Sequence, residues 1–127
     1  MPNADHALLL FSHGSPDPEW ARPLESLRDR LAAALPHQPV ALAFLPPAEP
    51  DFGAVVADLA QAGVTRVTVS PVFLARGGHV KRDLPEMAAA ATRMHGIAFT
   101  ILPTLGESDV MLSAIAQWIL DQTPGRS

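Results

Sequence analysis

Two histidines each follow a hydrophobic segment of the kind that forms a buried strand. His13 ends the run LLLFSH, and His79 lies in the glycine-rich stretch PVFLARGGHVKRDLP. If the two strands are neighbours in a parallel sheet, both imidazoles lie at its carboxyl edge, where open α/β sheets bind ligands. Neutral imidazoles in one cleft can bind a transition metal or accept protons near neutral pH. The sequence therefore predicts a metal or proton-transfer site on these two residues.

Segments of strand character alternate with segments of helical periodicity along the whole chain. We expect strands over residues 7–11, 40–44, 67–74 and 97–102, and helical stripes over residues 24–35, 52–59, 87–94 and 111–119. Gly63 and Gly96 are expected to follow helix ends. Asp83 with Glu86 has the spacing of a capping box at a helix start, and Ser108 is expected to cap the last helix.

This order predicts an α/β fold with a four-stranded parallel sheet and right-handed crossovers. A flavodoxin-like strand order of 2-1-3-4 makes the first and third strands neighbours and brings His13 and His79 together. The whole chain, residues 1–127, is expected to form a single three-layer domain, as its length suggests.

Composition excludes several classes of function. The chain has no cysteine, which removes thiolate catalysis and zinc-thiolate sites. A formal net charge of -4 argues against nucleic acid as a partner. The apolar runs are too short to span a membrane, and the N-terminal residues do not have the pattern of a signal peptide. We expect a soluble cytoplasmic protein without nucleic-acid or membrane partners.

Further candidates lie close to the two histidines. Gly77 and Gly78 allow a backbone to approach a flat ligand closely, although a flexible turn is the simpler interpretation. Arg76, Lys81 and Arg82 form either a solvated loop or a basic rim that recruits anions. Our hypothesis is that five residues bind the substrate. They are Ser15, Arg76, Gly77, Gly78 and Lys81.

Two acids follow the second predicted strand. Glu49 and Asp51 are more typical of acids favoured at a helix N-terminus than of ligands. Glu49 is nevertheless retained as a candidate accessory carboxylate.

The chain resembles the small CbiX-type class II chelatases, the sirohydrochlorin cobaltochelatase and ferrochelatase family of tetrapyrrole biosynthesis. The segments that carry the resemblance are LLLFSHGSPDP, AFLPPAEP and SPVFLARGGHVKRDLPEM. The resemblance implies a chelatase-like domain that inserts cobalt(II) or iron(II) into sirohydrochlorin. It also implies that His13 and His79 bind the metal and take the pyrrole protons, and that two copies pair as a homodimer around the cavity.

One departure from the family pattern concerns catalysis. The family commonly has glutamate directly after Phe-Leu, and this chain has Pro46 there, which supplies no carboxylate. The leading hypothesis is a sirohydrochlorin chelatase, which is a lyase, in a form that lacks the usual glutamate of the family's site. The alternative is a degenerate, non-catalytic module that binds metal or tetrapyrrole, and a flavin-binding domain of flavodoxin type is a distant third.

The metal is expected to be a substrate and not a permanently bound cofactor. Imidazole ligands do not distinguish well among cobalt, iron and nickel, so the sequence leaves these three metals open.

Overall fold

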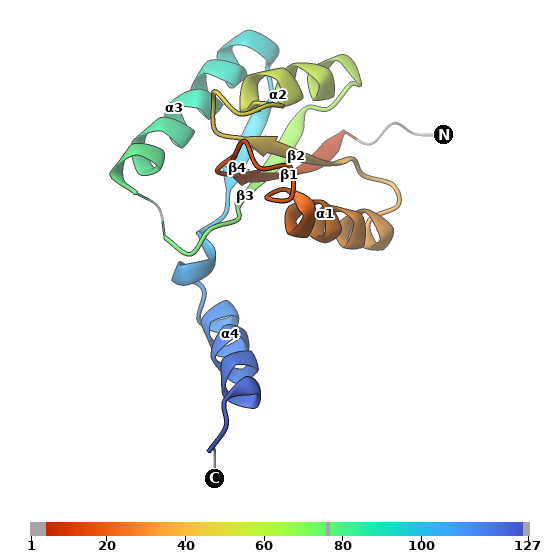
Figure 1. Cartoon of the computed structure of the whole chain (residues 1–127). Coiled ribbons are helices and arrows are strands. Elements are labelled where there is room, and N and C mark those ends of the chain that lie inside the picture. The colour runs from red at the N-terminus through yellow and green to blue at the C-terminus, as the bar shows by residue number, and fades with distance from the viewer. Residues whose placement is uncertain (1–4, 76, 126–127) are drawn as a thin grey trace.

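The computed structural model describes residues 5–75 and 77–125, apart from the side chains of residues 78–80. Strands and helices alternate along the chain (Figure 1). The strands are β1 (His6–Ser12), β2 (Val40–Phe44), β3 (Arg66–Pro71) and β4 (Ala98–Ile101). The helices are α1 (Arg22–Ala34), α2 (Phe52–Gln61), α3 (Gly78–His95) and α4 (Asp109–Gln122), and a short 3-10 helix, η1 (Leu105–Glu107), precedes α4.

The strands form one sheet in the order β2-β1-β3-β4, and every pairing is parallel. This confirms the predicted α/β class and the predicted strand order. Because β1 and β3 are hydrogen-bonded neighbours, the segments that carry His13 and His79 both start from the central part of the carboxyl edge.

The main core lies between the sheet and the pair α2 and α3. Val67 and Val69 of β3 point to this side, where they join Val56 of α2 and Leu84 of α3. On the opposite face, α1 packs Leu24 and Leu31 over a smaller cluster, which comprises Leu10, Leu42 and Phe44. The two helical layers enclose β1 and β2 on both faces, as parallel strands require.

Several helix ends follow the sequence signals. The Asp51 carboxylate accepts a hydrogen bond from the backbone N–H of Ala54 at 2.9 Å and caps α2. Gly63 and Gly96 adopt φ values of 91° and 71° just beyond α2 and α3, in the left-handed region that glycine tolerates. Ser108 caps α4 by accepting from the N–H of Met111, as expected.

Two boundary predictions in the third βα unit are wrong. Strand β3 ends at Pro71, three residues before the predicted end at Leu74. Helix α3 begins at Gly78 with Gly77 as its N-cap, so Asp83 and Glu86 lie inside the helix and do not form its capping box. Pro85 also lies within this helix. The helix therefore includes His79 in its first turn, where a loop was predicted.

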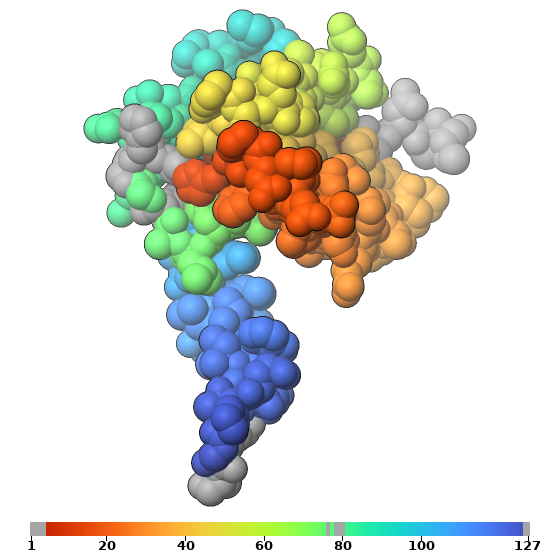
Figure 2. Space-filling model, in the orientation of Figure 1, coloured from red at the N-terminus to blue at the C-terminus, as the bar shows by residue number. Residues whose placement is uncertain are grey.

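The last helix departs from the three-layer arrangement that its stripe suggested. No residue of α4 is buried, and α4 projects away from the sheet beyond the loop that joins β3 to α3 (Figures 1 and 2). In the part of the chain that the structure describes, no helix is both long and apolar enough to cross a membrane.

Candidate functional site at the carboxyl edge of the sheet

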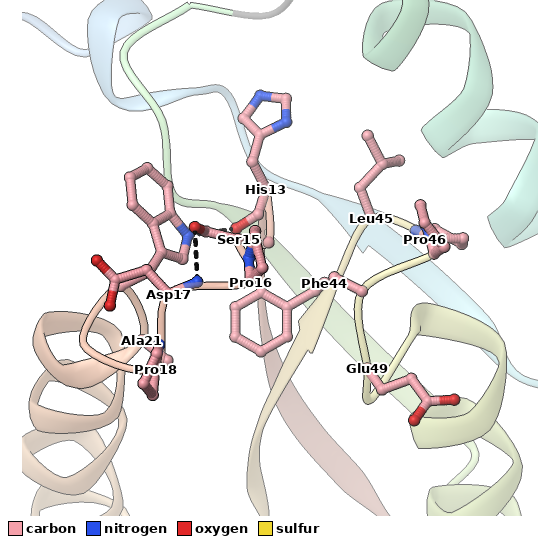
Figure 3. Close-up of a pocket in the computed structure, with 14 residues that line it drawn as sticks. His13, Ser15, Pro16, Asp17, Pro18, Ala21, Phe44, Leu45, Pro46 and Glu49 are labelled. Carbon is pink, nitrogen blue, oxygen red and sulfur yellow. Dashed lines mark hydrogen bonds between the residues drawn. The ribbon is translucent and has the colours of Figure 1, made fainter.

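His13 follows directly after the central strand β1, and its exposed side chain lines a pocket of about 680 Å³. The walls of this pocket come from the loop between β1 and α1 and the loop between β2 and α2 (Figure 3). The described lining residues are His13 to Pro18, Trp20, Ala21 and Phe44 to Glu49. The pocket therefore adjoins the β1–β2 side of the carboxyl edge.

Backbone hydrogen bonds hold the end of β1 between its neighbours. The N–H of Leu45 donates to the carbonyl of Ser12 at 2.9 Å, and the N–H of Val72 donates to the carbonyl of Phe11 at 2.8 Å. The His13 ring also lies 5.0 Å from the ring of Phe73, which belongs to the loop after β3. His13 is thus placed where the loops of β2 and β3 approach the loop of β1.

The loop that follows His13 is ordered by its own hydrogen bonds. The indole N–H of Trp20 donates to the carbonyl of His13 at 2.8 Å. The Ser15 hydroxyl accepts from the N–H of Asp17 at 3.1 Å, and Asp17 in turn accepts from the N–H of Glu19. Ser15, a predicted substrate-binding residue, therefore lines the pocket with a hydroxyl that also stabilises the turn.

Gly14 allows the two pocket loops to approach each other closely. A Cβ atom added at Gly14 would overlap the Cβ of Ala48 in the loop after β2. Only glycine avoids this overlap without a shift of one loop, so the glycine after His13 is needed for packing and not for flexibility.

The remaining predicted site residues have different placements. Gly77 caps α3, and Gly78 and His79 form its first turn. Lys81 is exposed on α3 and donates its backbone N–H to the carbonyl of Gly77 at 3.1 Å. Arg76 and the His79 side chain lie outside the described residues. The predicted shared cleft of His13 and His79 therefore stays a prediction.

The pocket is lined both by Pro46, which replaces the family's glutamate, and by Glu49, the candidate accessory carboxylate. Pro46 and Glu49 are exposed on the wall formed by the loop after β2. Figure 3 shows the His13 imidazole directed towards the top of the view, whereas the Glu49 carboxylate lies at the lower right and points away from it. Among the described residues, no three His, Cys, Asp or Glu side chains are grouped so that they could hold a metal ion. In this arrangement Glu49 does not supply the carboxylate that Pro46 lacks.

Trp20 is a pocket residue that sequence analysis did not identify. Its spacing fits the helical stripe of α1, but α1 begins only at Arg22 and Trp20 stays 48% exposed in the preceding turn. The signal that could have identified it is Pro23, because proline is tolerated only in the first turn of a helix and so leaves Trp20 outside α1. An exposed indole in the wall offers a flat apolar surface to a flat ligand.

His6 is half-buried, with Nδ1 at 2.5 Å from the Gln38 Oε1 atom and Nε2 at 2.8 Å from the Thr68 Oγ1 atom. His37 is exposed. His6 lies at the start of β1, at the opposite end of the strand from the pocket, so it serves as a structural link between β1, β3 and the loop after α1.

Comparison with known proteins agrees with this fold. A family model described as CbiX matches residues 7–122. The sirohydrochlorin cobaltochelatase of Methanopyrus kandleri is 35% identical over 81 residues, which cover 64% of this chain and 57% of that protein. The sirohydrochlorin cobaltochelatase of Methanosarcina acetivorans is 30% identical over 90 residues, which cover 71% of this chain and 69% of that protein. The chain thus spans little more than half the length of the first of these relatives.

Solved structures show the same fold. The crystal structure of a cobalamin biosynthesis CbiX protein from Marinobacter aquaeolei has a TM-score of 0.81 and 28% identity, and the match covers 92% of this chain and 96% of that one. The sirohydrochlorin chelatase SirB from Bacillus subtilis subspecies spizizenii, solved with cobalt, has a TM-score of 0.71 and 23% identity over 93% of this chain and 51% of that one. This second likeness concerns the fold alone.

Proposed function

Because this chain belongs to the CbiX family, we propose that it is a tetrapyrrole chelatase that inserts cobalt(II) or iron(II) into sirohydrochlorin. The observation that carries the proposal is the exposed His13 imidazole at the wall of the pocket, directly after the central strand. This is the position where open α/β sheets place residues that act on ligands. The names of the relatives supply the reaction and the substrate class.

The proposed reaction replaces two pyrrole N–H protons of the macrocycle with one divalent metal ion, and both protons leave to a base or to water. A neutral imidazole can hold the incoming metal or accept one of these protons. His13 is assigned this role from the pocket. The family motif assigns the second imidazole of the site to His79. His79 lies in the first turn of α3, which follows the loop that contains Phe73. The metal is a substrate here, and nickel(II) is a third candidate.

The pocket has the size and chemistry that a small-molecule site needs. Its volume of about 680 Å³ lies within the range of roughly 300–1,000 Å³ that is typical of ligand pockets. Its wall is largely apolar, with Trp20 and four prolines, which suits the face of a macrocycle. The described acids of the lining, Asp17 and Glu49, repel a polycarboxylate, so the anionic groups of the substrate are expected to lie towards Lys81 and Arg82.

The specific observation that favours a second candidate function is Pro46. With no carboxylate at this position and with Glu49 directed away from His13, the described loop after β2 places no carboxylate beside the imidazole. The alternative is therefore a module that binds metal or tetrapyrrole without efficient insertion. In either case we propose a cytoplasmic homodimer that acts on a small molecule, with no nucleic-acid or membrane partner.

The deciding experiment is anaerobic mixing of the protein with sirohydrochlorin and each of cobalt(II), iron(II) and nickel(II), followed by absorbance. A chelatase raises the insertion rate above the spontaneous rate, and His13→Ala lowers it by about 10²–10⁴-fold because a positioned base is lost. The matched control is His37→Ala, which removes an exposed imidazole at the far end of the sheet. If no metal inserts faster than it does without protein, the binding module is the correct function.

A further inference from the structure

Trp20 is a large apolar side chain that α1 does not carry into the core. Its spacing continues the stripe of Leu24 and Leu31, and these two leucines pack over the smaller core cluster. Because α1 begins only at Arg22, Trp20 lies in the preceding turn and stays 48% exposed. There it lines the pocket together with His13. Aromatic side chains in pocket walls commonly contact the ligand, so this exposed ring is a candidate for recognition.

Hydrogen bonds hold the indole in place. The indole N–H donates to the carbonyl of His13 at 2.8 Å, and the backbone N–H of Trp20 donates to the carbonyl of Asp17 at 3.0 Å. The indole nitrogen is the only polar atom of this side chain, so the rest of the ring offers carbon surface to the pocket. A side chain that is already ordered loses little conformational freedom when a ligand binds.

The second wall of the pocket is fixed relative to the first. Phe44, Leu45 and Pro46 line the pocket from the end of β2 and the loop that follows it (Figure 3). The N–H of Leu45 donates to the carbonyl of Ser12 at 2.9 Å. The close contact of Gly14 with Ala48 joins the two loops a second time. The pocket thus has two largely apolar walls whose separation is set by contacts between the loops.

The charges in the pocket do not favour the carboxylates of an anionic ligand. Apart from His13, the ionisable side chains among the described lining residues are Asp17 and Glu49, and both are acids. They repel the carboxylates of a polyanionic macrocycle. Within this pocket, such a ligand can therefore be held by the apolar face of its ring. Recognition here depends on the shape of the ring more than on its charge.

From these observations we propose that Trp20 makes the pocket specific for flat, conjugated macrocycles, because its indole stacks on the face of the ring. Aromatic stacking needs two flat faces at contact distance, which a puckered ring does not offer. The bond from the indole to the His13 carbonyl places a ring stacked on Trp20 beside the residue that carries the proposed reactive imidazole. This inference rests on the proposed function for the class of ligand and adds the residue that selects it.

The test compares two metal-free macrocycles with the same carboxylates. A polycarboxylate porphyrin is flat and conjugated, whereas the corresponding porphyrinogen is puckered because its bridging carbons are saturated. Anaerobic equilibrium dialysis measures the dissociation constant of the protein for each. The wild type should bind the porphyrin at least about tenfold more tightly than the porphyrinogen, which is the size of effect that one aromatic stacking contact provides.

Three variants assign this preference to the ring of Trp20. Trp20→Leu should reduce the ratio of the two dissociation constants to less than about threefold, since leucine has no flat face. Trp20→Phe keeps a smaller flat ring without the N–H and should hold the ratio above about fivefold. Leu27→Ala, which removes an exposed apolar side chain of α1 outside the pocket lining, is the matched control and should leave the ratio unchanged. Partial unfolding alters both constants alike and leaves their ratio intact.

Two kinds of result would overturn the inference. One is a wild-type ratio near unity, or a ratio that Trp20→Leu does not change. The other is an equal fall of the ratio in Trp20→Phe and Trp20→Leu, which would assign the effect to the N–H and not to stacking. Since no metal is present, the outcome is independent of insertion. Failure of the chelatase in the anaerobic mixing experiment would leave the role of Trp20 standing, and an unchanged ratio would leave the chelatase standing.

Discussion

At the scale of single residues, His13 shows how one position combines several constraints. Its backbone carbonyl accepts from Trp20, its ring lies against Phe73, and its imidazole remains exposed at the pocket. The residue is therefore held by contacts from two loops, and its side chain is still open to a ligand. This is the combination that a metal-handling or proton-accepting group requires.

The missing carboxylate gives a prediction at position 46. Pro46→Glu should raise the insertion rate, since a positioned general base contributes about 10²–10⁴-fold and even partial restoration is measurable. Glu49→Gln should leave the rate unchanged, because the Glu49 carboxylate points away from His13. Both rates are measured by the anaerobic absorbance assay. Loss of activity in Glu49→Gln, with no gain in Pro46→Glu, would mean that Glu49 has taken over the role.

The contact at Gly14 gives a prediction about stability. Gly14→Ala should lower the free energy of unfolding by about 1–3 kcal/mol, because the new methyl group overlaps Ala48 and forces the pocket loops apart. Urea unfolding followed by circular dichroism measures the change.

Gly53→Ala is the matched control for this substitution. A Cβ at Gly53 meets only the Asp51 Oδ1 atom at 3.7 Å, and the position lies in the first turn of α2. It should be neutral or stabilising by up to about 1 kcal/mol, since alanine favours helix over glycine. Equal destabilisation at both positions would show that the overlap at Gly14 is relieved without cost.

At the scale of elements, the start of α2 sets the far wall of the pocket. The cap at Asp51 fixes where the loop after β2 ends, and the N–H of Phe44 donates to the carbonyl of Pro50 at 2.9 Å beside it. Asp51→Ala should lower the free energy of unfolding by about 0.5–2 kcal/mol through loss of this cap. Asp51→Asn keeps the capping oxygen and should restore most of the loss. Thermal unfolding of the two variants checks this, and an equal loss in both would assign the effect to charge.

The third βα unit shows how an element boundary alters a site. Because α3 begins at Gly78, the backbone of His79 is helical and its position is set by the helix. Lys81 follows half a turn later on the exposed surface. The two residues that sequence analysis placed in one loop are therefore held by one rigid element.

At the scale of the whole molecule, the net charge is -4, and the proposed function predicts that the position of the basic residues also affects substrate binding. Lys81→Ala should raise the KM for a polycarboxylated macrocycle with little change in kcat, and it should weaken the dependence of kcat/KM on salt. Arg93→Ala, an exposed change in the last turn of α3, is the control. Steady-state rates at several salt concentrations provide the measurement. An equal effect of the two changes would show that only net charge matters.

Much of this architecture was determined by sequence alone. Alternation of apolar strands with helical stripes predicted the α/β class, and the strand order followed because right-handed crossovers leave few arrangements. Local signals such as Asp51, Gly63 and Ser108 were correct because capping and left-handed backbone depend on neighbouring residues only. The motif around His13 predicted its place at the carboxyl edge for the same local reason, since a strand end places the next residue at the edge of the sheet.

Other features were decided only by the tertiary structure. The start of α3 was mispredicted, because a capping pattern at Asp83 is indistinguishable in sequence from polar residues inside a longer helix. The pocket between the loops of β1 and β2 arises from contacts such as Gly14 with Ala48, which lie far apart in the chain. The apolar stripe of α4 predicts burial, but no residue of this helix is buried in the structure. The direction of α4 depends on the preceding η1, whose Leu105 and Gly106 N–H groups donate to carbonyls of the loop after β3.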